Sequence, residues 1–146
     1  MAEEFTNSYV AKHRVEFYET DMAGIVHFAN FYRFMEQAEH EFFRSLGLTI
    51  HGTLPDGTTF GWPRVAAQCS FKSPACYGDE IEIGMTILFL TSRSLTIKYE
   101  FRRDNVILAV GEMKSAYCLI PVGSKLMSAE IPAECLERLK TAFNAS

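Results

Sequence analysis

The feature that most constrains this chain is one long amphipathic helix pattern set among strand patterns. Between positions 30 and 47, apolar residues recur at helical spacing and charged residues fill most of the remaining positions. We expect a helix of about four to five turns here, with Asn30 as a cap at its start and Gly47 at its end. Its apolar stripe consists of Phe31, Phe34, Met35, Ala38, Phe42, Phe43 and Leu46.

Alternation of apolar and polar residues predicts strands before and after this helix. The segment 51–63 is expected to be a loop, because it is broken after His51 by Gly52, Pro55, Gly57 and Gly61. Asp104-Asn105 suits a tight hairpin turn, and a short final helix is expected over about 131–143, with Pro132 in its first turn. The predicted strands cover residues 9–17, 65–71, 81–89, 95–102 and 106–120.

The order strand, long helix, four strands, short helix predicts one α+β domain over residues 1–146. In it, a five-stranded, mainly antiparallel sheet wraps around the long helix. One helix cannot cover both faces and both edges of such a sheet, and open edges are usually paired or covered. We therefore expect a homodimer with sheets paired edge to edge, or a homotetramer built from two such dimers.

Composition excludes several functional classes. The net charge is −4, which argues against a generic nucleic-acid-binding protein. No apolar run reaches the roughly 18 residues of a membrane span, and the first residues do not have the pattern of a signal peptide. Four cysteines show neither CxxC pairs nor metal-ligand spacing, so we expect reduced thiols, no metal and a cytoplasmic location. They are Cys69, Cys76, Cys118 and Cys135.

The segment from Phe17 to Phe43 combines a strand end, an acidic turn, a glycine and a helix start. Backbone N–H groups at a helix start lack partners and carry the positive end of the helix dipole, so they can stabilise an oxyanion. Asp21 lies just before this helix, where a carboxylate could attack an acyl carbon or activate water. Alternatively, Asp21 is only a helix cap.

The string TDMAGIVHFANFYRFME, residues 20–36, resembles the signature of the 4-hydroxybenzoyl-CoA thioesterase-like acyl-CoA thioesterases of the hot-dog fold. The resemblance extends over about residues 9–121, and the order of elements agrees with it independently. It implies hydrolysis of an acyl-CoA to a free acid and CoA, without a metal and with no cofactor beyond the CoA of the substrate.

Carried over by position, the resemblance makes Asp21 the nucleophile or general base and the backbone N–H of Phe28 the donor to the thioester oxygen. It gives Gly24 the close turn and Glu36 a supporting role. Many bacterial relatives have a histidine where this chain has Phe28, whereas here His27 lies one position earlier. His27 is therefore a further candidate, as an acid or an orienting donor, or else a surface or packing residue.

Two more groups are candidates for substrate binding. Trp62 and Arg64 could close over the acyl group, or Trp62 could simply anchor the loop. Arg93 and Ser94 resemble the segment that holds the CoA nucleotide in relatives. Further cations for its phosphates are available in the same strand, unless they only form a solvated face. These are Lys98, Arg102 and Arg103.

Alternative functions are a hot-dog acyl-thioester hydratase or dehydratase and a non-catalytic acyl-CoA-binding protein. The acyl group stays open between an aromatic ring, such as benzoyl or naphthoyl, and a short-to-medium chain. The carrier stays open between CoA and an acyl carrier protein. Because one small domain offers no deep cleft, we expect the acyl pocket to form between two subunits.

Overall fold

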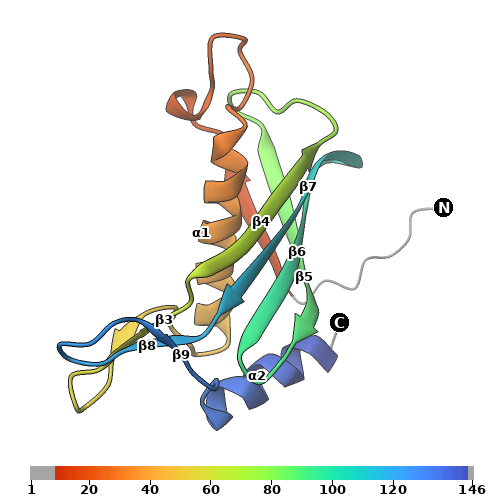
Figure 1. Cartoon of the computed structure of the whole chain (residues 1–146). Coiled ribbons are helices and arrows are strands. Elements are labelled where there is room, and N and C mark those ends of the chain that lie inside the picture. The colour runs from red at the N-terminus through yellow and green to blue at the C-terminus, as the bar shows by residue number, and fades with distance from the viewer. Residues whose placement is uncertain (1–8, 145–146) are drawn as a thin grey trace.

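Five strands form one antiparallel sheet in the order β1-β5-β6-β7-β4, and the long helix α1 packs against one of its faces (Figure 1). The computed structural model describes residues 9–144. The predicted five-stranded sheet with one long helix and a short final helix is confirmed. The elements are β1 (Tyr9–Arg14), α1 (Ala29–Ser45), β4 (Arg64–Phe71), β5 (Glu80–Leu90), β6 (Ser94–Arg103), β7 (Val106–Ala116) and α2 (Ala133–Asn144).

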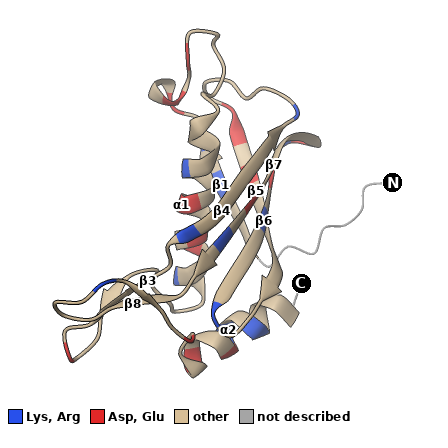
Figure 2. Cartoon of the chain, viewed as in Figure 1, with Lys and Arg blue, Asp and Glu red and all other residues tan. Residues whose placement is uncertain are grey.

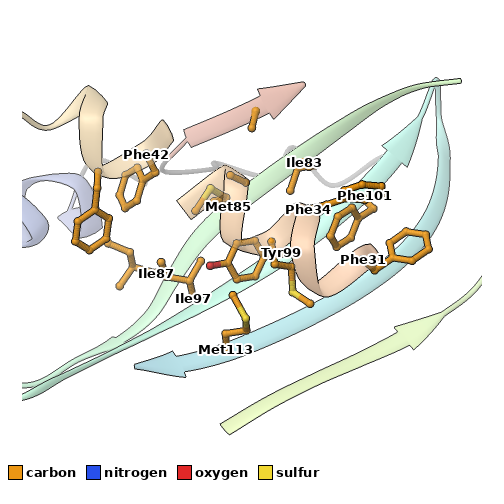
Figure 3. Packing of buried hydrophobic residues seen from close by; sticks show 14 of the residues in the cluster. Phe31, Phe34, Phe42, Ile83, Met85, Ile87, Ile97, Tyr99, Phe101 and Met113 are labelled. Carbon is orange, nitrogen blue, oxygen red and sulfur yellow. The ribbon is translucent and has the colours of Figure 1, made fainter. Parts of the chain in front are cut away.

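The core lies between α1 and the sheet, where the apolar stripe of the helix meets the alternating residues of β5 and β6 (Figure 3). Gly111 on β7 lies against the side chain of Met35 on α1. A Cβ atom there would lie 2.5 Å from the sulfur of Met35. The Met35 side chain therefore packs against the backbone of β7 at Gly111, and a larger residue there would force that side chain to shift.

The chain before α1 differs from the prediction. The first strand ends at Arg14, and Phe17 begins a 3-10 turn, Phe17–Glu19, with its side chain exposed. The turn forms because the Glu19 carboxylate accepts the N–H of Glu16 at 2.7 Å. The predicted cap is also wrong, because Asn30 lies inside α1 and its side chain donates to the Glu19 carbonyl at 2.7 Å.

Two further expectations need correction. Phe89 ends the alternating pattern of 81–89, but its side chain is exposed because the register with β6 shifts between Ile87 and Phe89.

The predicted strand 106–120 divides at Tyr117, whose N–H donates to the Arg93 carbonyl at 2.9 Å. The chain beyond it joins a second, unpredicted sheet of four short strands. In spatial order these are β2 (Gly52–Thr53), β3 (Thr59–Gly61), β8 (Cys118–Ile120) and β9 (Met127–Ser128).

Strand β4 is an open edge of the main sheet. Its hydrogen-bonded neighbour is β7, and most of its side chains are exposed. Such an edge is a surface that proteins usually pair or protect. The expected pairing of subunits at this edge stays a prediction. None of the helices within residues 9–144 has the length and apolar character needed to span a membrane.

Candidate active site

A tight turn holds Asp21 in place. The backbone N–H of Asp21 donates to the Ile25 carbonyl at 2.9 Å, and its own carbonyl accepts the N–H of Gly24 at 3.0 Å. Gly24 has a φ of +79°, a conformation that other residues rarely adopt, so the expected glycine turn is present. Asp21 Oδ1 accepts the N–H of Ala23 at 2.8 Å. Its other carboxylate oxygen receives no hydrogen bond from residues 9–144.

The backbone N–H of Phe28 is unpaired at the start of α1. The neighbouring N–H groups all have acceptors: His27 donates to the Glu19 carbonyl at 2.9 Å, and Asn30 donates to the His27 carbonyl at 2.9 Å. The N–H of Ala29 donates to Nδ1 of His27 at 3.2 Å. Within the described part of the chain, Phe28 N–H has no acceptor. It is therefore available to an external oxygen at the positive end of the helix dipole.

Asp21 and Phe28 line the same pocket, which has a volume of about 540 Å³. This is within the usual size range of small-molecule sites. The opposite wall of the pocket comes from the end of β4 and the loop that follows it. A hydrogen bond connects this loop to the Asp21 loop, because the N–H of Val26 donates to the Ala75 carbonyl at 2.8 Å. The lining residues are Asp21, Ile25, Val26, Phe28, Phe31, Phe71, Lys72, Ser73, Pro74 and Ala75.

Aromatic rings form much of the pocket wall. Phe71 meets Phe31 edge to face at a centroid distance of 5.4 Å and Phe28 at 6.3 Å. Phe31 in turn packs against Phe101 at 5.1 Å, so the wall continues into the core (Figure 3). Asp21 is the one acidic residue and Lys72 the one basic residue that line this pocket. The pocket thus offers an apolar, ring-lined space with one carboxylate and one ammonium group.

His27 lies beside this pocket without lining it. Its Nδ1 accepts the N–H of Ala29 at 3.2 Å. The ring stacks on Phe28 at a centroid distance of 4.7 Å. The His27 ring thus contacts the first residue of α1, while the N-cap position falls on Phe28, which makes no side-chain cap hydrogen bond.

The structure does not bring Trp62 and Arg64 to the Asp21 pocket of the same subunit. Trp62 is buried edge to face against Phe43, near the opposite end of α1, at a centroid distance of 5.6 Å. Asp21 precedes the first residue of this helix of 17 residues, which is roughly 25 Å long. Arg64 donates to the buried Glu39 carboxylate at 2.9 Å and to Ser115 Oγ at 2.7 Å.

The residues expected to bind CoA are divided between the two ends of β6. Arg93 and Ser94 lie at its start, where the Arg93 guanidinium donates to Ser128 Oγ at 3.3 Å. Arg102 and Arg103 lie at its end, and a strand of 10 residues is about 33 Å long. Arg102 pairs with Glu100 at 2.7 Å and Arg103 with Asp79 at 2.8 Å. Basic residues are spread over the molecule rather than gathered on one face (Figure 2).

Arg103 is the member of this set that lies near the pocket. Its guanidinium donates to the carbonyl of Pro74, a lining residue, at 3.2 Å. It thus supports the wall from behind. Lys72, which no sequence pattern singled out, lines the pocket itself. Because the Lys72–Ala75 wall is contributed by a loop far along the chain, only the strand topology could have revealed it.

A buried polar cluster under α1 was also not anticipated. Glu39 is one of the charged residues between the apolar positions of the helix pattern, yet only 2% of its surface is exposed. Burial raises the pKa of the Glu39 carboxyl above its ordinary value, and the nearby Arg64 guanidinium opposes that rise. The helical spacing indicates that Glu39 lies on the buried side of α1. It follows Met35 by four residues and precedes Phe42 by three, and both of these belong to the apolar stripe.

The cysteine thiols do not provide a nucleophile for this pocket. None of the four lines it, and burial raises the pKa of Cys69 to about 11. The same effect raises the pKa of Cys135 to about 11. A thiol with such a pKa is almost entirely protonated near neutral pH and therefore unreactive. Asp21 is the carboxylate that lines this pocket.

Comparison with known proteins places this geometry in context. Residues 15–139 match the model of the family described as the thioesterase-like superfamily. The chain is 33% identical over 132 residues to a protein of Aquifex aeolicus (strain VF5), covering 90% of this chain and 98% of that one. It is 27% identical over 135 residues to the 4-hydroxybenzoyl-CoA thioesterase of Pseudomonas sp. (strain CBS-3), covering 89% and 96% of the two chains.

Among solved structures, the gentisyl-coenzyme A thioesterase BH1999 is similar, with a TM-score of 0.74 and 29% identity. The match covers 86% of this chain and 98% of that one. The expected hot-dog fold, with its antiparallel sheet and long helix, is confirmed by this likeness together with the family match.

Proposed function

This chain belongs to the thioesterase-like superfamily and is a thioester hydrolase, and we propose that it cleaves an aromatic acyl-CoA through Asp21 and the backbone N–H of Phe28. The single observation that carries the proposal is that these two groups line one pocket, each with an unpaired reactive atom. Hydrolysis of a thioester needs one group to supply an oxygen nucleophile and another to stabilise the oxyanion.

In the proposed reaction, the substrate carbonyl oxygen accepts a hydrogen bond from Phe28 N–H. The free oxygen of Asp21 then attacks the carbonyl carbon, the carbon–sulfur bond breaks and CoA leaves as a thiolate. Water hydrolyses the resulting anhydride, which releases the acid and restores the carboxylate. Alternatively, Asp21 takes a proton from a water molecule whose oxygen attacks the carbonyl carbon directly. The carbon–sulfur bond then breaks, and the proton on Asp21 passes to the departing CoA sulfur, which restores the carboxylate. Both routes use the same two protein groups.

The proposal of an aromatic acyl group is supported by the ring-lined wall. The faces and edges of Phe28, Phe31 and Phe71 suit a planar ring, because aromatic pairs gain energy beyond simple burial of area. The names of two similar proteins, a 4-hydroxybenzoyl-CoA and a gentisyl-CoA thioesterase, agree with a substituted benzoyl group. A short-to-medium acyl chain is the alternative, and CoA is proposed as carrier rather than an acyl carrier protein.

The proposed site also includes a second subunit. Phe71 is 48% exposed and belongs to the open edge strand β4, so a copy paired at this edge would lie next to the pocket. We propose a homodimer in which the partner contributes part of the acyl wall. Analytical ultracentrifugation should give the mass of a dimer or a dimer of dimers, and a monomeric mass at assay concentration would contradict this.

The test of the function is D21N assayed on a panel of benzoyl, naphthoyl and straight-chain acyl-CoAs. The variant should lose nearly all turnover, whereas D104N, the same exchange at an exposed turn, should remain fully active. Free CoA and the free acid should be the products by mass spectrometry. An intact thioester that has gained or lost water would indicate a hydratase, and full activity of D21N would overturn the proposed mechanism.

A further inference from the structure

His13 and Glu19 form a half-buried hydrogen-bonded pair behind the Asp21 loop. His13 Nε2, on strand β1, lies 2.8 Å from Oε1 and 3.0 Å from Oε2 of Glu19. The Glu19 side chain is only 6% exposed, and its Oε1 also accepts the N–H of Glu16 at 2.7 Å. The His13 ring packs against Phe34 of α1 at a centroid distance of 4.4 Å. The pair is therefore fixed between the sheet and the helix.

The backbone of Glu19 extends this connection to both reactive groups. Its carbonyl accepts the N–H of His27 at 2.9 Å and the side-chain amide of Asn30 at 2.7 Å. These two donors flank Phe28, so Glu19 fixes the part of the chain that presents the Phe28 N–H. Glu19 also ends the turn two residues before Asp21. One residue thus holds both ends of the loop that carries the proposed site.

We propose that His13 is a positioning residue for this reaction, which acts by anchoring Glu19 and thereby setting the distance between Asp21 and the Phe28 N–H. The inference rests on the proposed function but goes beyond it, because His13 does not line the pocket. A displacement of about 1 Å in a reacting group can lower turnover by about two orders of magnitude. Loss of the anchor should therefore reduce kcat more than it changes KM.

The chain offers a matched pair of variants. The amide of Gln can reach the position of His Nε2, whereas the amide of Asn reaches only the position of Nδ1. H13Q should keep the donor to Glu19 and retain kcat within about threefold, while H13N should lower kcat by at least about tenfold with KM nearly unchanged. R14Q removes the neighbouring ion pair of β1, which is an exposed contact of 3.0 Å between Arg14 and Glu80. This control variant should leave kcat and KM unchanged.

A merely structural role would lower the melting temperature without separating these two variants. Equal kcat values for H13N and H13Q, measured on folded protein, would overturn the inference. If H13N does not fold, H13F replaces it as the test, because its ring keeps the packing against Phe34 but has no donor to Glu19. Retention of kcat within twofold by folded H13F would overturn the inference equally. D21N separates the proposed function from the proposed role of His13. An active D21N contradicts the function itself. An inactive D21N together with an active H13N contradicts only the role of His13.

Discussion

Asp21 and Phe28 line one pocket, and the backbone N–H of Phe28 has no acceptor within residues 9–144. Proline can test this donor without its side chain, because the φ of Phe28 is −53°, close to the value that proline requires. F28P should lower kcat by about 100-fold or more, as the loss of one oxyanion donor does. F28A keeps the N–H and serves as the control.

The comparison of these two variants is decisive in steady-state kinetics. F28A should mainly raise KM, because it removes a ring from the acyl wall while the donor remains. Circular dichroism should show that F28P keeps its helix content. Equal kcat values for the two folded variants would contradict a role for the Phe28 N–H.

Phe71 should control the size of the acyl group. Its ring closes the wall against Phe31 at 5.4 Å and is half-exposed, so F71A enlarges the pocket at little cost in stability. The ratio of kcat/KM for naphthoyl-CoA over benzoyl-CoA should rise by about tenfold. F89A, which truncates an exposed ring of β5 away from the pocket lining, should leave this ratio unchanged.

Trp62 should contribute to stability and not to the choice of acyl group. It is buried between Phe43, at 5.6 Å, and Tyr117, at 5.3 Å. W62F should lower the free energy of unfolding by about 1–3 kcal/mol in urea titrations. Its ranking of acyl-CoAs by kcat/KM should match that of the wild type, and an altered ranking would place Trp62 in the acyl site after all.

Removal of the Arg64 cation should make stability depend on pH. Arg64 lies 2.8 Å from the buried Glu39 carboxylate, and R64M should cost about 3–5 kcal/mol near neutral pH. Burial already raises the pKa of Glu39, and without Arg64 the rise should be larger. Above the ordinary carboxyl pKa, the folded state then holds more protons than the unfolded state, so the stability of R64M falls as pH rises.

Urea unfolding at pH 5 and pH 8 measures this difference. R64M should be closer to the wild type at pH 5, where the Glu39 carboxyl is more readily protonated, than at pH 8. The double variant E39Q/R64M has no carboxyl to titrate and should lose the dependence. The same deficit for R64M at both pH values would show that Glu39 does not cause it.

Local periodicity predicted the main helices and strands. It failed where contacts between residues distant in the sequence determine which side chains are buried or paired. The stripe of α1 and the alternation of β5 are visible in the sequence because both repeat within a few residues. Asp21 and Phe28 could be found because one continuous segment carries them. The burial of Glu39 depends on Arg64, a residue 25 positions away, and no local pattern announces that pairing.

One further difference has the same cause, and two arise from hydrogen bonds that apolar periodicity does not register. The pocket wall at Lys72–Ala75 meets the Asp21 loop only because the sheet order places β4 beside β7 and the following turn returns toward α1. Phe17 leaves the strand because the Glu19 carboxylate captures the Glu16 N–H and forms a turn. Asn30 does not cap the helix because its side-chain amide donates to the Glu19 carbonyl and the N-cap position falls on Phe28.

The unpaired N–H of Phe28 has a consequence for engineering. A hydrogen bond that is not made in the folded protein forgoes about 0.5–1.5 kcal/mol, so a side chain that supplied an acceptor there would be favoured in any search for thermostability. Such a variant would melt at a higher temperature and turn over more slowly. Selection for heat resistance alone would thus close the position that the proposed mechanism needs open, and turnover should be screened alongside it.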